Sequence, residues 1–283
     1  LWENGRPFEE VDERIIRDMF SGIQNRTRKE RFVMVFRKLA RIAAILLIPL
    51  LSVLSGYLYF NPVNQEEGIG NLVVHADRGE RSGVTLPDGT QVKLNAESSL
   101  SYTHDFGREL RQVNLEGEAY FEVTRNEDKP FVVHTKYLDI EVLGTSFNVY
   151  SYERENVMEM ALISGRIKIQ TCSEPSRVVY LKPNEKALFN KESGIITVEK
   201  TDNRFETAWL RGDLVFRSTT LSDVLAKLER RYGVNIHLND SSLANDLFTG
   251  NFDSEYIVEV MDLLERHYDF TYDVRGDDIF IHP

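Results

Sequence analysis

A stretch of nineteen residues without a charged side chain limits what this chain can fold into. Residues 42–60, IAAILLIPLLSVLSGYLYF, are almost entirely apolar. At about 1.5 Å of rise per residue, a helix of this length spans the roughly 30 Å hydrocarbon core of a bilayer. Pro49 and Gly56 are tolerated in membrane helices, and three aromatic residues gather at one end, as at a membrane interface. The sequence therefore predicts a transmembrane helix over 42–60.

Charge is distributed unequally on the two sides of this stretch. Residues 1–41 hold ten Lys and Arg against seven Asp and Glu, whereas residues 61–283 hold twenty-four against thirty-eight. Basic segments stay on the cytoplasmic side of a membrane. We therefore predict a single-pass inner-membrane protein with its N-terminus in the cytoplasm and its C-terminus in the periplasm. The acidic bulk argues against direct binding of nucleic acid, and about forty preceding residues argue against a cleaved signal peptide.

The predicted cytoplasmic arm, residues 1–41, contains an amphipathic pattern. Val11, Ile15 and Met19 follow one another at steps of four residues, with Phe20 beside them and charged residues elsewhere. A short arm cannot bury this apolar face internally. We therefore predict that Val11, Ile15, Met19 and Phe20 bind a partner protein; the alternative is a partly ordered arm without a partner.

After a linker over 61–71, residues 72–203 alternate apolar and polar residues in short runs separated by turn residues, which predicts an all-β domain. In VTLPDGTQVKLN (84–95), the turn from Pro87 to Thr90 joins two such runs. Proline restricts φ and glycine accepts a positive φ, so this segment predicts a β-hairpin.

Residues 204–283 change to a mixed pattern, which predicts a small α+β domain of order βαββαββ. Its helices are expected over 220–233, with Thr220 or Ser222 as the N-cap and Gly233 at the end, and over 254–268. Strand 248–252 would lie at an edge. Phe248, Thr249 and Phe252 are therefore candidates for binding a partner strand by β-augmentation.

No pattern of a known catalytic or metal site is present. The six histidines show no ligand spacing, the acidic pair Glu116 and Glu118 fits the solvated side of a strand, and Cys172 has no second cysteine to pair with. We predict no metal, no cofactor and no enzymatic activity.

Several long phrases resemble the FecR-like family of transmembrane anti-sigma factors. They are VTLPDGTQVKLNAESSLSY (84–102), LEGEAYFEV (115–123), PFVVHT (130–135), VLGTSFNVYSY (142–152) and WLRGDLVF (209–216). The last domain resembles the short N-terminal domain of secretins and TonB-dependent transporters, with FTGNF (248–252) as its most specific phrase.

This resemblance implies partners that the pattern of residues does not name. It implies that the cytoplasmic arm binds an extracytoplasmic-function sigma factor. It also implies that the periplasmic domains receive a signal from the signalling domain of an outer-membrane TonB-dependent transporter, which controls uptake genes for an iron chelate or a glycan.

The resemblance also draws attention to Gly144 and Thr145, because some FecR-like relatives are cleaved between Gly and Thr. A threonine hydroxyl can attack the preceding carbonyl, and glycine admits the strained backbone that this attack requires. The alternative is a bulge in a strand, where Thr145 is simply a good strand former.

Two other functions stay open. A membrane-tethered carbohydrate-binding module would also be rich in β-structure and would use exposed aromatic residues such as Tyr120, Phe121, Tyr150 or Tyr152. A scaffold for envelope assembly is suggested only by the secretin-like last domain.

Overall fold

The computed structural model describes residues 49, 51, 70–239, 241–253 and 256–282. The chain divides into two compact units, Leu1–Gly68 and Ile69–Pro283. The predicted arm and nearly all of the predicted span over 42–60 lie outside the described residues. Within the described part of the chain, no helix is long and apolar enough to cross a membrane.

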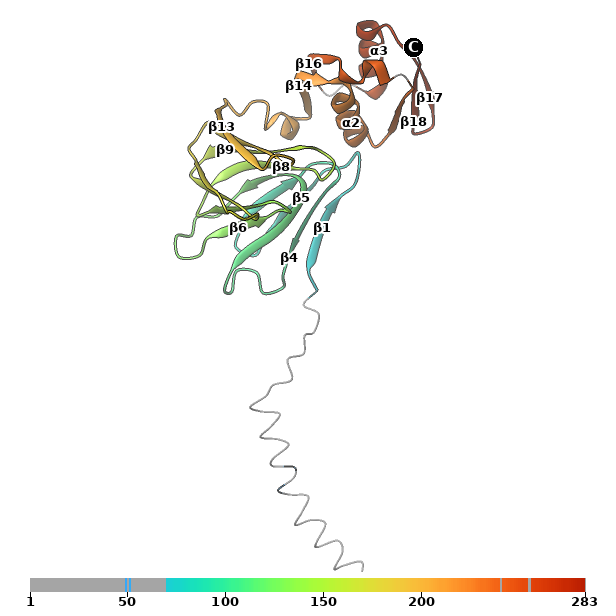
Figure 1. The fold of residues 1–283 in the computed structure, drawn as a ribbon. Helices are drawn as coiled ribbons and strands as arrows, with labels where there is room; N and C mark the ends of the chain where they lie inside the picture. Colours follow the sequence, from blue (N-terminus) through green and yellow to red (C-terminus); the bar gives the residue numbers. More distant parts are fainter. Residues whose placement is uncertain (1–48, 50, 52–69, 240, 254–255, 283) are drawn as a thin grey trace, which may run out of the picture. The chain divides into compact units, whose positions relative to one another are not determined.

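Residues 72–200 form a β-sandwich, as the alternating pattern predicts (Figure 1). One sheet has the strand order β1-β4-β5-β6-β7-β10-β11, and the other has the order β2-β3-β5-β8-β9-β12-β13. The strands are β1 (Leu72–Ala76), β2 (Ser82–Thr85), β3 (Gln91–Leu94), β4 (Ser98–Tyr102), β5 (Arg111–Glu122), β6 (Phe131–His134), β7 (Leu138–Val142), β8 (Ser146–Ser151), β9 (Val157–Ser164), β10 (Ile167–Thr171), β11 (Val178–Leu181), β12 (Glu185–Asn190) and β13 (Ile195–Lys200).

Strand β5 belongs to both sheets. Its first half pairs with β4 and β6, and its second half pairs with β3 and β8. The change occurs at Gly117, whose φ of 96° suits glycine and where a Cβ atom would lie 2.3 Å from Ser98 Oγ. Any larger residue at this position would therefore collide with β4.

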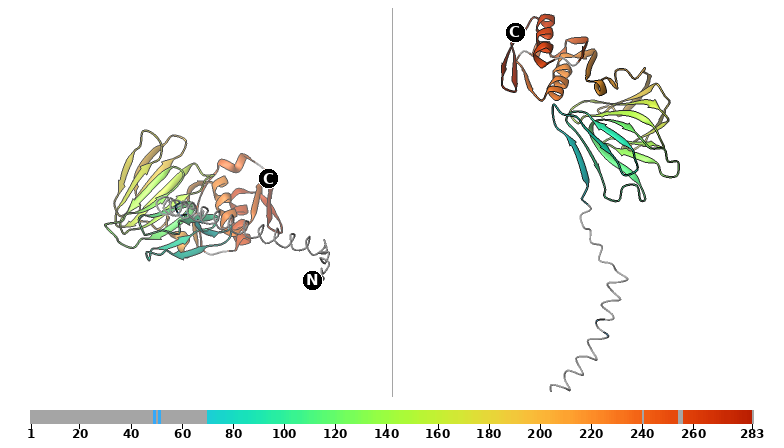
Figure 2. Two further views of the ribbon diagram at one scale, coloured as in Figure 1. Left: turned by 90° about the horizontal axis from the view of Figure 1, so that it is seen from below. Right: turned by 180° about the vertical axis from the view of Figure 1, so that it is seen from behind.

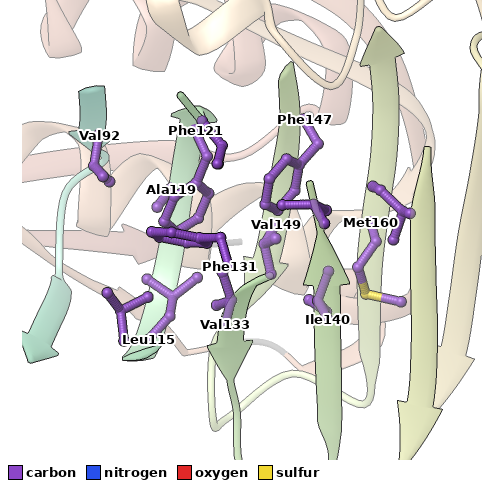
Figure 3. Packing of buried hydrophobic residues seen from close by; sticks show 14 of the residues in the cluster. Val92, Leu115, Ala119, Phe121, Phe131, Val133, Ile140, Phe147, Val149 and Met160 are labelled. Carbon is purple, nitrogen blue, oxygen red and sulfur yellow. The ribbon is translucent and has the colours of Figure 1, made fainter. Parts of the chain in front are cut away.

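The two sheets bury one apolar core between them. Phe121 and Phe147 of one sheet stack with ring centroids 5.0 Å apart, and Phe131 of the other sheet packs edge-on against Phe121. Figure 3 shows these rings with Val133 and Ile140 in the same layer. The alternating apolar residues of the sequence thus point inward from both sheets.

The predicted hairpin over 84–95 is confirmed. Val84 pairs with Val92 across β2 and β3, and Gly89 has a φ of 85° in the turn. Asp88 accepts hydrogen bonds from the backbone N–H and the hydroxyl group of Thr90. It also forms an ion pair with the buried Arg111 at 3.0 Å. The turn is therefore tied to the start of β5.

The small last domain contains two α-helices, as predicted. Its elements, seen from further sides in Figure 2, are β14 (Asp213–Thr220), α2 (Leu221–Tyr232), β15 (Asn235–Leu238), the 3₁₀ turn η2 (Ser241–Asn245), β16 (Leu247–Asp253), α3 (Ile257–Tyr268), β17 (Thr271–Arg275) and β18 (Asp278–His282). β14 pairs with β16, and β18 lies between β15 and β17. These elements enclose a second apolar core that includes Phe216, Leu228 and Leu264.

Helix α2 begins and ends at the predicted signals. Thr220 accepts a hydrogen bond from the backbone of Asp223, and Gly233 follows the helix in the left-handed conformation. Helix α3 begins three residues later than predicted, at Ile257, where the Glu259 carboxylate accepts a hydrogen bond from the backbone of Tyr256 at 3.0 Å. Since all described residues of both cores belong to Ile69–Pro283, we expect this unit to fold without residues 1–68.

Candidate functional site

The partner-binding residues predicted in the arm, Val11, Ile15, Met19 and Phe20, lie outside the described residues. Their role in binding a sigma factor therefore stays a prediction.

The three residues predicted on strand 248–252 lie on β16. Phe248 and Phe252 stack on each other in the core of the last domain, with ring centroids 5.6 Å apart, and both are buried. Thr249 is exposed, and its hydroxyl accepts a hydrogen bond from the backbone of Ser218 on β14. In the described part of the chain, β16 pairs with β14 alone. A partner strand added here would therefore contact the backbone and outward residues such as Thr249, rather than the two phenylalanines.

Gly144 and Thr145 connect β7 to β8. A Cβ atom on Gly144 would lie 2.6 Å from the Cα atom of Arg125, so a close approach between two backbone segments accounts for the glycine. Thr145 is buried, and its hydroxyl donates a hydrogen bond to the carbonyl of Arg166 at 3.1 Å. These contacts explain both residues structurally, and cleavage at this bond stays a prediction.

Two further sets of candidates concern metal binding and glycan binding. The described residues contain no group of three His, Cys, Asp or Glu side chains suited to a metal ion. Among the aromatic candidates for glycan binding, Phe121 is fully buried, and Tyr120 and Tyr152 are nearly so.

A buried carboxyl group lies on the outer face of the sheet that contains β3, β5 and β8. Glu118 on β5 is 6% exposed, so its interpretation as a solvated residue is wrong, whereas Glu116 is exposed. The Glu118 carboxylate accepts hydrogen bonds from the side-chain amides of Asn95 at 2.7 Å and Asn148 at 2.9 Å. Burial raises the pKa of Glu118 from 4.5 to about 7, against the opposing effect of the two amides.

Trp209 is hydrogen-bonded to one of the two amides that hold this carboxyl group. It belongs to the 3₁₀ turn η1 (Ala208–Arg211) in the linker 201–212 between the two domains, and its indole N–H donates to Asn148 Oδ1 at 3.0 Å. Arg81 donates to Asn95 Oδ1 at 3.3 Å and lies over the Trp209 ring at 5.9 Å. We call Arg81, Asn95, Glu118, Asn148 and Trp209 the Glu118 network.

A second polar cluster fixes the linker to the same sheet. Lys186 on β12 forms ion pairs with Glu159 of β9 at 2.8 Å and with Glu206 of the linker at 2.9 Å. Thr201 donates a hydrogen bond to Glu206 at 2.8 Å. Burial raises the pKa of Glu159, although Lys186 opposes this effect.

Helix α2 contributes a buried arginine to the contact between the domains. Arg230 forms an ion pair with Glu155 at 2.6 Å and lies 3.6 Å from the centre of the Tyr152 ring. Tyr152 in turn donates a hydrogen bond to the carbonyl of Ala96 at 2.7 Å. Arg230 of the last domain is thus held by Tyr152 and Glu155, which follow β8 in the β-sandwich.

The turn between β1 and β2 reaches the end of the same helix. The Gly79 backbone N–H donates to the carbonyl of Arg230 at 2.8 Å, and Arg78 donates to Asn235 Oδ1 at 3.0 Å. A Cβ atom on Gly79 would approach Gly233 to 3.4 Å, and both glycines have positive φ. Two glycines therefore permit the close approach of the two chain segments.

A groove of about 690 Å³ remains between these contacts, and both domains line it. Its lining includes Glu118, Glu159, Lys186, Lys227 and Arg231. Contacts made by charged and polar groups around such a groove are directional, and they are weaker than the burial of a large apolar surface. Through these contacts, a change in the position of the last domain can alter the outer face of the β-sandwich. We take the groove and the contacts around it as the candidate functional site.

From the sequence alone, Glu118 is placed on a solvated face, and Asn148, Trp209 and Arg230 are not identified. Glu118 and the exposed Glu116 are two residues apart on β5, so strand alternation alone places both side chains on the solvent face. The available signal was the tryptophan at the start of WLRGDLVF (209–216), because a large aromatic residue between two domains needs a surface to cover.

Comparison with known proteins covers both domains. Residues 73–168 match the family described as FecR protein, and residues 213–281 match the family described as FecR, C-terminal. Two crystal structures of a "putative anti-sigma factor" from Parabacteroides distasonis ATCC 8503 have 34% sequence identity to this chain, with TM-scores of 0.68 and 0.69. Each alignment covers 75% of this chain and 98% of the other. No curated protein sequence matches the chain.

Proposed function

Because this chain belongs to the FecR family and shares its fold with an anti-sigma factor, we propose that it is an inner-membrane anti-sigma factor that responds to an outer-membrane TonB-dependent transporter. Its partner in the cytoplasm is an extracytoplasmic-function sigma factor. Its partner in the periplasm is the signalling domain of the transporter. The outcome is control of transcription of uptake genes.

One observation carries this proposal, namely that the match to the anti-sigma factor includes 98% of that chain. The uncharged stretch over 42–60 and the basic segment before it support a single crossing of the inner membrane. The apolar face of the arm supports binding of a protein partner on the cytoplasmic side.

The two domains supply what a receiving module needs. β16 offers backbone groups and the exposed Thr249 to a partner strand, and the linker 201–212 connects β14 directly to the contacts around Trp209. We propose that the transporter's signalling domain binds the last domain at this edge and that the linker conveys the effect to the β-sandwich.

The decisive experiment tests the arm in the full chain. We expect Phe20→Asp to abolish capture of an extracytoplasmic-function sigma factor from the same organism, because a charge would interrupt the apolar face. Ser21→Asp adds the same charge to the neighbouring residue and is the matched control, which should retain capture. Sigma binding that persists after deletion of residues 1–41 would refute the proposal.

A further inference from the structure

The Glu118 network contains donors that fix the orientation of both amides around the carboxyl group. An indole N–H and a guanidinium group donate hydrogen bonds and accept none. Asn148 must therefore turn its oxygen toward Trp209, and Asn95 must turn its oxygen toward Arg81. Both amides then present N–H groups to Glu118. This arrangement suits an ionised carboxylate, which accepts at both oxygens.

We propose that Glu118 is a proton-operated switch at the linker between the two domains, where uptake of one proton turns an amide and releases either Arg81 or Trp209. A protonated carboxyl group has an O–H that needs an acceptor, whereas the amide nitrogen facing it accepts no hydrogen bond. If Asn95 turns, its NH₂ group meets the Arg81 donor. If Asn148 turns, its NH₂ group meets the Trp209 donor. In both cases one existing hydrogen bond is lost.

The charged and titratable groups facing Glu118 set the pH at which this exchange occurs. Lys227 of α2 and Arg81 favour the carboxylate, and Glu159 of β9 opposes it. Glu118 raises the pKa of the Tyr150 and Tyr152 phenols, which therefore stay uncharged near neutral pH. Burial outweighs the favourable groups and brings the pKa of Glu118 close to neutrality. No salt bridge to Glu118 is formed by the described residues. Both protonation states are therefore accessible near pH 7.

Trp209 reports the change whichever amide turns. Loss of the Asn148 bond removes the acceptor of the indole N–H, and loss of the Asn95 bond frees the guanidinium group that lies over the same ring. The Arg81 bond, at 3.3 Å, is the longer of the two, so we expect Asn95 to turn first. The switch does not depend on the proposed sigma-factor function, because every group in it lies in the unit Ile69–Pro283.

The unit Ile69–Pro283 allows a direct test, because Trp209 is its single tryptophan and Trp2 lies outside it. We expect the fluorescence emission of Trp209 in a 69–283 fragment to titrate between pH 5 and pH 9 with a midpoint near 7. Glu118→Gln mimics the protonated carboxyl group, because its NH₂ group faces the nitrogen of one of the two amides. The Trp209 emission of this variant should therefore stay at the wild-type value for acidic pH throughout this range. Glu159→Gln removes a neighbouring buried carboxylate that opposes ionisation of Glu118, so it should keep the transition and lower its midpoint.

Three results would overturn the proposal: a flat wild-type titration, a transition that persists in Glu118→Gln, or a transition that is lost in Glu159→Gln. The wild-type fragment provides a second measurement if a variant fails to fold. Its one indole N–H resonance in a ¹H–¹⁵N spectrum should shift with the same midpoint as the Glu118 carboxyl carbon. Different midpoints for these two resonances would contradict the switch. Sigma binding that persists after deletion of residues 1–41 would refute the proposed function and leave this outcome unaffected.

Discussion

The environment of a single carboxyl group makes the stability of this protein depend on pH. Glu118 is buried beside two amides, without a salt bridge in the described part of the chain, and its pKa rises from 4.5 to about 7. Unfolding would return the side chain to water. The folded protein therefore binds a proton in a pH range where the unfolded chain has already released it.

This difference predicts a particular change in stability. Between pH 4.5 and pH 7, the free energy of unfolding should fall as pH rises, by at most about 3 kcal/mol, and it should change little from this cause above pH 7. Glu118→Gln cannot ionise and should lack this contribution. Urea unfolding of both proteins between pH 4.5 and pH 8 measures the difference, and a constant difference across this range would contradict the assignment.

At the scale of elements, α2 is the helix that connects the last domain to the sandwich. Its start and end follow local signals at Thr220 and Gly233, and its apolar face belongs to its own domain core. Its buried Arg230, however, is paired across the domain boundary with Glu155. The same helix thus serves the fold of one domain and its contact with the other.

We predict that Arg230→Met loosens this contact without unfolding either core. Removing a hydrogen bond between charged groups costs about 2 kcal/mol and leaves Glu155 with the Tyr150 hydroxyl as donor but without its cation. Chymotrypsin should then cleave the linker at Phe205 at least about tenfold faster. Arg266→Met on the exposed side of α3 is the matched control and should cleave as the wild type does. Equal rates for Arg230→Met and wild type would show that the ion pair does not hold the domains together.

At the scale of the whole molecule, the chain combines an uncharged stretch over 42–60 with a compact unit over Ile69–Pro283. Under the proposed function, a signal received by this unit reaches the predicted arm through the predicted membrane helix over 42–60. Because one helix conveys bending poorly, we predict release of the arm as a unit.

Cell fractionation tests the predicted topology. We expect the full chain to remain in the membrane fraction after a high-salt wash, because its attachment is apolar rather than ionic. A fragment of residues 69–283 should be released into the soluble fraction. Protease added to spheroplasts should digest the last domain and leave the arm intact, and digestion of the arm instead would reverse the orientation.

Local patterns predict much of this fold because neighbouring residues determine them. The hairpin over 84–95 follows from Pro87, Asp88 and Gly89 between two apolar runs, and α2 follows from its apolar period and its caps. Helix α3 begins later than predicted because Tyr256 and Glu259 cap it, which the apolar period does not reveal.

By itself, the sequence determined the β-rich class of the larger domain, the two-helix last domain and the family, because strand alternation, capping residues and long family phrases are properties of contiguous segments. Only the tertiary structure decided that β5 passes between two sheets at Gly117, that Gly144 lies against Arg125, and that Glu118 is buried while Glu116 is exposed. Each of these depends on a segment distant in sequence. Trp209 lies ninety-one residues beyond Glu118, and its hydrogen bond to Asn148 places the linker on the face of the sheet where Glu118 is buried.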